Sequence, residues 1–554
     1  MQVEKNVYVP MRDGVHLTVD IYRPDAEGKF PALLALSPYG KEIQTLPIPP
    51  QPRETSPLWD GCIEAGDTEY LVGHGYVHVI GDVRGTGYSE GEYVGLFSKQ
   101  EAEDGHDLVE WIAQQPWCDG NVGMIGISYF AMIQIFIAAE QPPHLKAIFP
   151  FDPAWMDTYR RIYTGGILST FLYGLWDGRD GDSGFAPRNV VSAMMKTLPK
   201  PEVDRLFEEA LSNPDIRCYS NFYHLLKYPQ KNPVFVDFLL NPNDGPFYWE
   251  RSPHTKFDRV KIPVYTGHVM SAHPAGVDGA ISAYLEIDAP KKLLLPPPVP
   301  LERPYHQYHD ELIRWYDYWF KGIDNGIMNE PPIKLFVTVA NQWRYEHEWP
   351  LARTKWTKLY LRPWGRLSPE PETKSDEPSY FVQQPLYISG KKGPVKYLSP
   401  PLPEDTEITG PLALYLYASI DQDDTNWILE LNDVDEYGNK LLRPVSRGYL
   451  KASHRALDES KSKPWRPEHL HTNPEPVVPG EIYEYAIDLV PCAHLFKAGH
   501  RIELEIASMD SPWDSVLARS AGEYHICSSK TTLHKIYHDK EHPSHVLLAV
   551  IPKT

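Results

Sequence analysis

The sequence predicts an α/β fold, in which crossover helices connect the strands of a parallel sheet, followed by a separate β-rich region. Continuous apolar runs alternate with helical patterns over residues 30–150. Strand patterns are scarce over residues 152–261, and short strand-like runs between turn residues fill the chain beyond residue 341. Alternating strands and helices are typical of a parallel sheet, and short strands between turns are typical of a β-sandwich.

Length and composition limit the class of protein. A chain of 554 residues exceeds one ordinary core, so we expect two to four domains. With 42% hydrophobic and 23% charged residues, the chain is globular. A net charge of −20 argues against binding to nucleic acid or to an acidic membrane, because such binding needs a cluster of basic residues.

The first 151 residues predict one part of the α/β domain. A β-hairpin is expected over residues 3–24, around the turn Arg12-Asp13-Gly14. Four apolar runs predict buried parallel strands, and two periodic segments between them predict helices. The strands are Ala32–Leu36, Tyr76–Ile80, Gly123–Gly126 and Ala147–Pro150, and the helices are Asp104–Gln114 and Tyr129–Glu140.

The next segment reads as a helical insertion, after which the α/β domain resumes. Amphipathic helices are expected at Asn189–Lys196 and Pro201–Leu211. Two further strands, Ile262–Thr266 and Lys291–Leu295, precede a helix at His309–Lys321. The predicted domains are therefore an α/β core over residues 1–151 and 262–345, a helical cap over 152–261, and a β-sandwich over 346–554.

The β-sandwich is predicted from its short strands. Helical patterns are few there, and turn-rich stretches separate the apolar runs. These runs are Leu412–Tyr417, Trp427–Leu431, Tyr483–Leu489, Arg501–Ile506 and Val546–Ile551. We expect this domain to supply no acid, base or nucleophile.

The best candidate for chemistry is Ser128, in the segment Gly126-Ile127-Ser128-Tyr129. It stands between an apolar strand and a helix, where a strained turn can expose a nucleophilic serine if the neighbouring residues are small. Gly126 meets this need, but Phe130 occupies the position of the usual second glycine. The alternative is a serine that only caps a helix.

A second candidate is Tyr39, in the loop after the strand at Ala32–Leu36. In a fold of this kind that loop supplies one donor to a developing oxyanion, and the amide after the nucleophile supplies the other. The expected pair is the Tyr39 hydroxyl and the Tyr129 backbone N–H. The alternative is a Pro-Tyr turn that only packs a loop.

Other motifs do not indicate a cofactor or a metal. Residues 82–91 fail the G-x-G-x-x-G template of dinucleotide binding because Glu90 occupies the third glycine position, so we expect a rigid loop with Arg84 in a buried ion pair. Three close histidine pairs lack the spacing of a metal site: His306 with His309, His268 with His273, and His469 with His471.

Cysteine usage and hydropathy indicate the setting. The five cysteines are too far apart for a disulfide framework or a CxxC metal site. Neither a signal peptide nor an apolar run long enough to span a membrane is visible. We therefore expect a cytoplasmic protein.

Taken together, several motifs resemble the CocE/NonD-type family, which contains cocaine esterase, X-prolyl dipeptidyl peptidases and α-amino-acid ester hydrolases. The motifs are Pro38-Tyr39-x-Lys41, Asp82-x-Arg84-Gly85-x-Gly87-x-Ser89-x-Gly91, residues 111–123, Gly126-x-Ser128-Tyr129, Arg314–Asp317 with Lys321–Asp324, and Gly499–Ile502. The resemblance implies an α/β-hydrolase fold with an inserted helical cap and a C-terminal jelly roll. It also implies Ser128 as nucleophile and Tyr39 with the Tyr129 amide as oxyanion hole.

Two members of the usual catalytic triad are missing from their expected places. The family places the catalytic acid after the strand that corresponds to residues 264–266, where this chain has Gly267–His273 without Asp or Glu. The catalytic histidine follows the strand that corresponds to 293–295, where Pro300 stands. Proline cannot accept a proton, so ordinary serine-esterase activity is expected to be weak or absent.

Several residues are candidates to replace the missing pair. The predicted base is His268 or His273, with His306 and His309 as further alternatives, and Asp152 or Asp157 could supply a relocated acid. Tyr39, Trp155 and His306 are the predicted substrate-binding residues.

The sequence leaves three functions open. The first is a Ser128-dependent hydrolase or acyl transferase for the ester or amide bonds of a small acyl or peptide-like substrate. The second is the same fold redirected to a lyase or cyclase reaction, and the third is a binding protein without catalysis. No cofactor is expected, and self-association into a homo-oligomer stays open.

Overall fold

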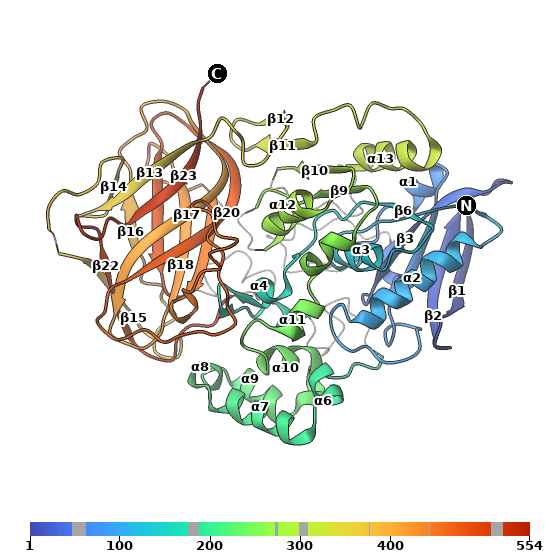
Figure 1. Ribbon diagram of the computed structural model, residues 1–554, viewed down its shortest axis with the longest axis horizontal. Helices are drawn as coiled ribbons and strands as arrows, with labels where there is room; N and C mark the ends of the chain where they lie inside the picture. Colours follow the sequence, from blue (N-terminus) through green and yellow to red (C-terminus); the bar gives the residue numbers. More distant parts are fainter. Residues whose placement is uncertain are drawn as a thin grey trace.

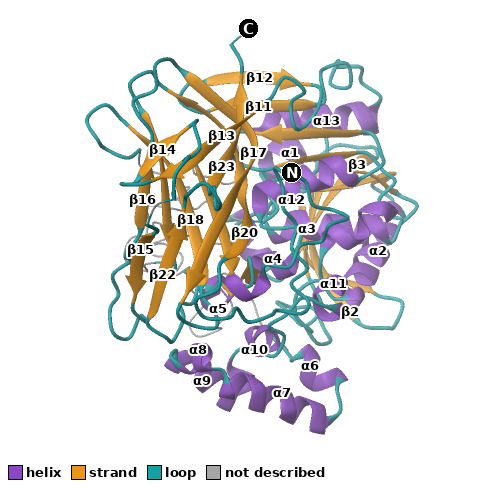
Figure 2. Ribbon diagram, turned by 60° about the vertical axis from the view of Figure 1, so that its left-hand side comes forward, coloured by secondary structure: helices purple, strands orange, loops and turns teal. Residues whose placement is uncertain are grey.

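A computed structural model gives the architecture of the chain (Figure 1). The structure describes residues 1–46, 63–175, 188–271, 275–297, 308–375, 377–441, 444–510 and 524–553. A ten-stranded sheet with covering helices fills one half of the molecule, and a β-rich domain fills the other (Figures 1 and 2). A group of short helices projects below both halves in these views.

The ten-stranded sheet confirms the predicted parallel core. Its order is β1-β2-β4-β3-β5-β6-β9-β10-β11-β12, and all neighbours from β4 to β11 are parallel. The strands are β1 (Gln2–Pro10), β2 (His16–Arg23), β3 (Phe30–Ser37), β4 (Val77–Asp82), β5 (Cys118–Met124), β6 (Leu145–Ile148), β9 (Val264–Gly267), β10 (Lys291–Leu295), β11 (Ile333–Val337) and β12 (Gln342–Glu346).

Helices on both sides of the sheet bury its apolar strands. They are α1 (Thr68–Gly73), α2 (Lys99–Ala113), α3 (Tyr129–Ala139), α12 (Gly276–Glu286) and α13 (His309–Lys321). Helix α2 begins five residues earlier than predicted because Ser98 and Glu101 form a reciprocal capping box at its start. Every residue of α3 is buried, so this helix shows no amphipathic face.

The segment between β6 and β9 is mainly helical, as expected. It contains α4 (Thr158–Ile162), α5 (Phe171–Leu175), α6 (Ala193–Thr197), α7 (Lys200–Ser212), α8 (Pro214–Arg217), α9 (Ser220–Lys227), α10 (Pro233–Leu239) and α11 (Pro246–Glu250). It also contains a hairpin that was not predicted, β7 (Tyr163–Thr164) with β8 (Ile167–Leu168). Helix α6 is shorter than predicted, because residues 189–191 pair with the Gly85 and Tyr93 backbone and Ser192 caps the helix.

The C-terminal domain is built from eleven strands, and the fold class predicted from the sequence is confirmed. Its longest strands, β17 (Thr406–Ile420) and β20 (Tyr483–Phe496), pair along most of their length. The others are β13 (Lys355–Arg362), β14 (Arg366–Ser368), β15 (Ser379–Gln383), β16 (Val395–Leu398), β18 (Asn426–Val434), β19 (Ser446–Lys451), β21 (Arg501–Ala507), β22 (Thr532–Tyr537) and β23 (His545–Ile551). They enclose a second hydrophobic core that includes Trp427 and Phe496.

Close backbone contacts join the helical cap to the β-domain. A Cβ atom added to Gly165, in the β7–β8 turn, would lie 2.0 Å from the Tyr449 carbonyl oxygen. The Lys451 N–H donates to the Gly165 carbonyl at 2.7 Å.

Cys118, Cys218, Cys492 and Cys527 are unpaired, while Cys62 lies outside the described residues. In the part that the structure describes, no helix is long and apolar enough to cross a membrane.

Candidate functional site

Ser128 stands in a sharp turn between β5 and α3. Its backbone angles are φ 57° and ψ −119°, a left-handed conformation that a serine rarely adopts. Gly126 is required two residues earlier, because it has φ +120° and an added Cβ would lie 2.3 Å from Phe130 Cβ. The Ser128 side chain makes no capping hydrogen bond to α3, so the structure does not support a helix-capping serine. This strained turn is the geometry that a nucleophile elbow needs.

The turn is fixed by the strand next to it. The Ser128 N–H donates to the Asp152 carbonyl at 2.9 Å, and the Ser128 carbonyl accepts from the N–H groups of Ala131 and Met132, each at 3.1 Å. Ser128 is 8% exposed. Among the described contacts, none bonds its Oγ to His469, His471 or His500.

Tyr39 lies beside the elbow, as predicted. Its ring packs edge-on against Tyr129, with centroids 5.8 Å apart, and against Phe130 at 6.2 Å. Tyr129 is the first residue of α3, and the first N–H groups of a helix have no partner within the helix. The two residues that carry the predicted oxyanion donors, Tyr39 with its hydroxyl and Tyr129 with its N–H, are therefore in contact through their rings.

Sequence reasoning missed Glu101, which lies beneath the elbow. The fully buried Tyr129 hydroxyl donates to this carboxylate, and the Tyr93 hydroxyl lies 3.2 Å from the Tyr129 hydroxyl. Burial raises the pKa of Glu101 to about 7, although its hydrogen bonds from Tyr129 and Ser98 act in the other direction. In the sequence, the spacing of Ser98 and Glu101 is that of a capping box, which indicates the start of a helix and not a functional site.

The structure brings together two of the proposed replacements, Asp152 and His268. His268 follows β9 directly, and its Nε2 lies 3.1 Å from Asp152 Oδ1. The Asp152 N–H donates to the Gly267 carbonyl at 2.7 Å, which connects the ends of the two neighbouring strands. His268 Nδ1 donates to the Val269 carbonyl at 2.7 Å. Nδ1 is thus engaged as a donor, while Nε2 faces the Asp152 carboxylate without a hydrogen bond, so this His268 conformation directs its acceptor nitrogen at Asp152.

The other predicted residues have different positions. Trp155 is 2% exposed, its Nε1 donates to Thr158 Oγ1, and its ring packs near Phe97. Trp155 therefore packs in the core in this conformation, and its role in substrate binding stays a prediction.

The remaining acid and base candidates are not gathered at Ser128. The Asp157 carboxylate caps α4, and the His309 ring stacks on Tyr70 with centroids 3.8 Å apart. His273 and His306 were predicted as base and substrate-binding residue, and both lie outside the described residues, as does Pro300.

Arg84 occupies the buried ion pair that the sequence predicts. Its guanidinium donates to Asp104 at 2.7 and 2.8 Å and to Asp13 at 2.8 Å. In the described part of the chain, no group of three or more His, Cys, Asp or Glu side chains has an arrangement that could hold a metal ion.

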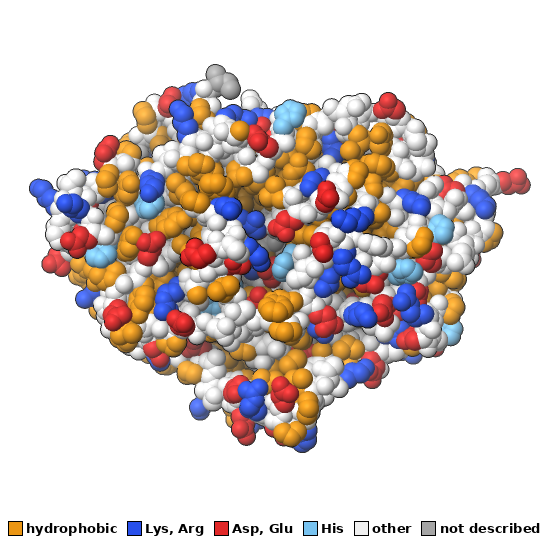
Figure 3. Space-filling view, in the orientation of Figure 1, with side chains coloured by type: hydrophobic (Ala, Val, Ile, Leu, Met, Phe, Trp, Pro, Cys, Tyr) orange, Lys and Arg blue, Asp and Glu red, His pale blue; other side chains and the backbone are white. Residues whose placement is uncertain are grey.

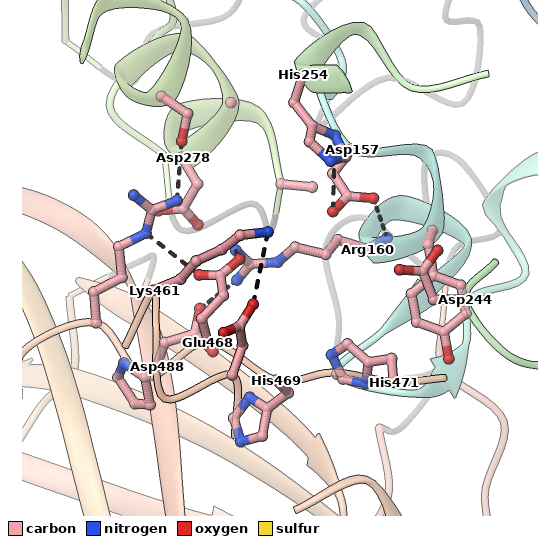
Figure 4. Close-up of a pocket in the computed structure, with 18 of the residues that line it drawn as sticks. Asp157, Arg160, Asp244, His254, Asp278, Lys461, Glu468, His469, His471 and Asp488 are labelled. Carbon is pink, nitrogen blue, oxygen red and sulfur yellow. Dashed lines mark hydrogen bonds and ion pairs between the residues drawn. The ribbon is translucent and has the colours of Figure 1, made fainter. Parts of the chain in front are cut away.

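A cavity of about 710 Å³ lies between the helical cap, α12 and the β-domain (Figure 4). Charged side chains of both signs surround a hollow near the middle of the face in Figure 3. Met156 and Ala275 line the cavity, and each is close in sequence to the Asp152–His268 pair. A Cβ added to Gly276, next to Ala275, would lie 2.2 Å from His268 Nε2. The cavity therefore begins next to the segment that packs on His268.

Two carboxylates of the cavity stand outside its ion pairs. Arg160 reaches across it to Asp488 and lies 3.9 Å from Glu468, which Arg466 also approaches at 3.6 Å (Figure 4). Asp278 on α12 and Asp244, which lie on different sides of the cavity in Figure 4, make no ion pair within 4 Å in the described part of the chain. Burial is the main cause that raises the pKa of each carboxyl to about 6. Each of them is therefore a candidate partner for a cationic ligand group.

Two family models match the chain. Residues 13–298 match the X-Pro dipeptidyl-peptidase (S15 family), and residues 325–547 match the X-Pro dipeptidyl-peptidase C-terminal non-catalytic domain. A cocaine esterase from Rhodococcus sp. (strain MB1 Bresler) is 27% identical over 100% of this chain and 99% of that protein. A putative Xaa-Pro dipeptidyl-peptidase from Bacillus anthracis is 25% identical over 92% and 83% of the two chains.

Solved structures share the fold over almost the whole chain. A CocE/NonD family hydrolase from Staphylococcus aureus has a TM-score of 0.77 at 23% identity, over 99% of this chain and 93% of that one. An α-amino acid ester hydrolase has a TM-score of 0.74 at 20% identity, over 99% and 96% of the two chains. The resemblance seen in the sequence is confirmed.

Proposed function

Because the chain belongs to the S15 family of X-Pro dipeptidyl-peptidases and is a serine-type hydrolase of that family, we propose that Ser128 is its nucleophile. The proposed substrates are ester or amide bonds of a small acyl or peptide-like compound. One observation carries the proposal: Ser128 occupies a strained elbow whose backbone is bonded to Asp152, the carboxylate partner of His268. A nucleophile, a histidine and a carboxylate are the components that acyl transfer requires, although here the carboxylate faces Nε2, the nitrogen that must accept the proton.

The proposed reaction begins when Ser128 Oγ attacks the substrate carbonyl carbon. The carbonyl oxygen then becomes an oxyanion, which the Tyr39 hydroxyl and the Tyr129 N–H stabilise by hydrogen bonds. The bond from the acyl carbon to the alcohol or amine then breaks, and the acyl group stays on Ser128 as an ester until water hydrolyses it. Each donor of this kind contributes about 10²–10³-fold to the rate.

The proton of Ser128 has one nearby acceptor in the proposal, the Asp152–His268 pair. His268 Nδ1 is a donor to the Val269 carbonyl, so Nε2 is the nitrogen that must accept the proton. Transfer therefore requires Nε2 to exchange Asp152 for Ser128 Oγ when substrate binds. Catalytic hydrogen bonds often form only in the substrate complex, but this rearrangement costs rate. We accordingly expect turnover of simple esters to be slow.

Labelling with a fluorophosphonate tests the nucleophile. We expect a mass increase of one label on the wild-type protein, at a slow rate, and none on Ser128→Ala. Turnover of a p-nitrophenyl ester should disappear in the same variant. Labelling or turnover that persists in Ser128→Ala would contradict the proposal. Bound ester without turnover in either protein would favour the lyase, cyclase or non-catalytic alternatives.

We further propose that the polar end of the substrate extends into the cavity. The carboxylates of Asp244 and Asp278, which make no ion pair in the described part of the chain, favour a protonated amine there. This is consistent with a peptide-like substrate that has a free amino group.

Substitution of Asp278 by Asn tests this extension. For a dipeptide ester with a free amine we expect KM to rise about tenfold and kcat to change little, since a hydrogen bond to a charged group is lost. KM for the N-acetylated ester should stay constant. In the wild type, KM of the amine substrate should also rise as pH falls through about 6, where Asp278 becomes protonated and neutral. Equal effects on both esters would show that Asp278 does not recognise the amine.

A further inference from the structure

The loop at residues 82–91, which no step of the proposed reaction uses, lies against the loop that presents Tyr39. Strands β3 and β4 are paired, and their last residues, Ser37 and Asp82, are opposite each other. The Val83 N–H donates to the Ser37 carbonyl at 3.1 Å. The two loops therefore leave the sheet side by side at the edge where Ser128 stands.

Asp82 connects these two loops through its side chain. Its Oδ1 accepts from the Lys41 N–H at 2.7 Å, and its Oδ2 accepts from the Tyr88 N–H at 3.3 Å. Asp82 is 1% exposed, so neither bond is replaced by water without opening the loops. Lys41 is two residues after Tyr39, and the intervening Gly40 has φ 83°. The backbone next to the proposed oxyanion donor is thus fixed by a buried carboxylate.

The other end of Lys41 is buried in the same way. Its Nζ lies 3.0 Å from Asp20 Oδ1 and donates to Asn6 Oδ1 at 2.6 Å, and the Lys41 and Asp20 side chains are both fully buried. On the other side of the donor, the Tyr39 N–H donates to Ser37 Oγ at 3.1 Å. The Tyr39 segment therefore has polar anchors before and after it.

Two glycines of the loop have neighbours that leave no room for a side chain. A Cβ added to Gly87 would lie 2.0 Å from Asp82 Oδ2, and one added to Gly85 would lie 2.1 Å from the Tyr93 N atom. A side chain at 87 would therefore displace the carboxylate from the Tyr39 loop. Gly87 thus makes room for Asp82, and Gly85 makes room for the Tyr93 backbone, so neither glycine needs a bound nucleotide to explain it.

We propose that Asp82 is a positioning residue for the Tyr39 hydroxyl, acting through the Lys41 backbone, and that residues 82–91 form the support of the oxyanion hole. This rests on the proposed function, in which Tyr39 stabilises the oxyanion. Asn in place of Asp82 accepts at only one atom, so its amide NH₂ would face either the Lys41 or the Tyr88 N–H. The Tyr39 loop would then shift, and small displacements of a catalytic group cost up to about 10² in rate.

A double-mutant cycle of Asp82→Asn and Tyr39→Phe tests the proposal on the full-length protein. We expect Tyr39→Phe alone to lower kcat about 10²–10³-fold. Asp82→Asn alone should lower kcat at least about tenfold with KM nearly constant. In the Tyr39→Phe background, Asp82→Asn should have no further effect, because its action passes through the missing hydroxyl. Rates are expressed per folded enzyme, measured by circular dichroism, because labelling of Ser128 itself depends on the oxyanion hole.

Asp433→Asn is the matched control. Asp433 is another buried carboxylate, but it lies in the C-terminal β-domain, where its partners are His494 and His500. It should lower the melting temperature and leave kcat within about twofold. If Asp82→Asn does not fold, Gly87→Ala, compared with Gly14→Ala, replaces it, because Gly14 has φ +86° and open space around it.

The outcomes separate the two proposals. A strong Tyr39→Phe effect with an unchanged Asp82→Asn, or with effects that multiply in the double variant, would overturn the positioning role and retain Tyr39 as donor. Tyr39→Phe without effect would remove the proposed oxyanion hole, and the role of Asp82 with it.

Discussion

Replacing His268 by Gln is expected to lower kcat/KM for esters about 10³-fold or more. Removal of the base from a serine hydrolase leaves only the contribution of the oxyanion hole and of substrate binding. Glutamine keeps a donor for the Val269 carbonyl but cannot accept and return a proton. Asp152→Asn should have a smaller effect, because Nε2 has left Asp152 when the proton moves and only the nearby negative charge stabilises the imidazolium. Steady-state ester hydrolysis, scaled to the concentration of folded protein from circular dichroism, measures both.

The control for this pair is a second buried His–Asp contact in the β-domain. His494 Nε2 lies 2.8 Å from Asp433 Oδ2, and His494 is 6% exposed, the same fraction as His268. His494→Gln should reduce stability and leave kcat/KM within about twofold. Retained turnover in His268→Gln, together with its loss in Ser128→Ala, would place the base on another histidine such as His273 or His306.

The strand order and the elbow could be predicted because they depend on short-range patterns. Apolar runs such as Ala32–Leu36 are buried on both faces, and the residue order around Ser128 specifies a strand, a turn and a helix. Strands β11 and β12 were missed. In β12 the aromatic residues Trp343 and Tyr345 alternate with polar ones, but both are exposed and only Glu346 is buried, so this edge strand has no buried apolar face.

The acid–base pair could be named in the sequence but not assembled. Asp152 and His268 follow different strands, and only the adjacency of β6 and β9 brings their side chains together. The helical cap separates these strands along the chain, so no spacing rule connects the two residues. Glu101 shows the opposite difficulty. Its local role in a capping box was visible, but its contact with Tyr129 depends on the packing of α2 against α3.

The surroundings of Trp155 could not be predicted for a related reason. Its sequence neighbours do not distinguish a cavity from a core. The structure fills the space around Trp155 with Phe97 and bonds its indole N–H to Thr158. Burial of this kind is a tertiary property, which local patterns do not contain.

Gly126→Ala is expected to remove both activity and much of the stability. The new Cβ would lie 2.3 Å from Phe130 Cβ and 3.1 Å from the Glu64 carbonyl oxygen, and both of these neighbours belong to packed backbone segments. Gly126 also has φ +120°, which alanine adopts only at a cost of about 1–3 kcal/mol. The overlap adds about 1–3 kcal/mol, so the free energy of unfolding should fall by about 2–6 kcal/mol.

The effect on chemistry should exceed the effect on folding. To relieve the contact, the chain must move Phe130, and with it Tyr129 and the Tyr39 ring that packs on both. Fluorophosphonate labelling of the folded fraction should therefore become at least about 10² slower. Gly480→Ala is the matched control, since Gly480 has φ +85° with nothing within 4 Å of an added Cβ, and it should show the backbone cost alone. Wild-type labelling kinetics in a folded Gly126→Ala protein would mean that Ser128 does not depend on this turn, because the overlap at residue 126 cannot be relieved while Phe130 stays in place.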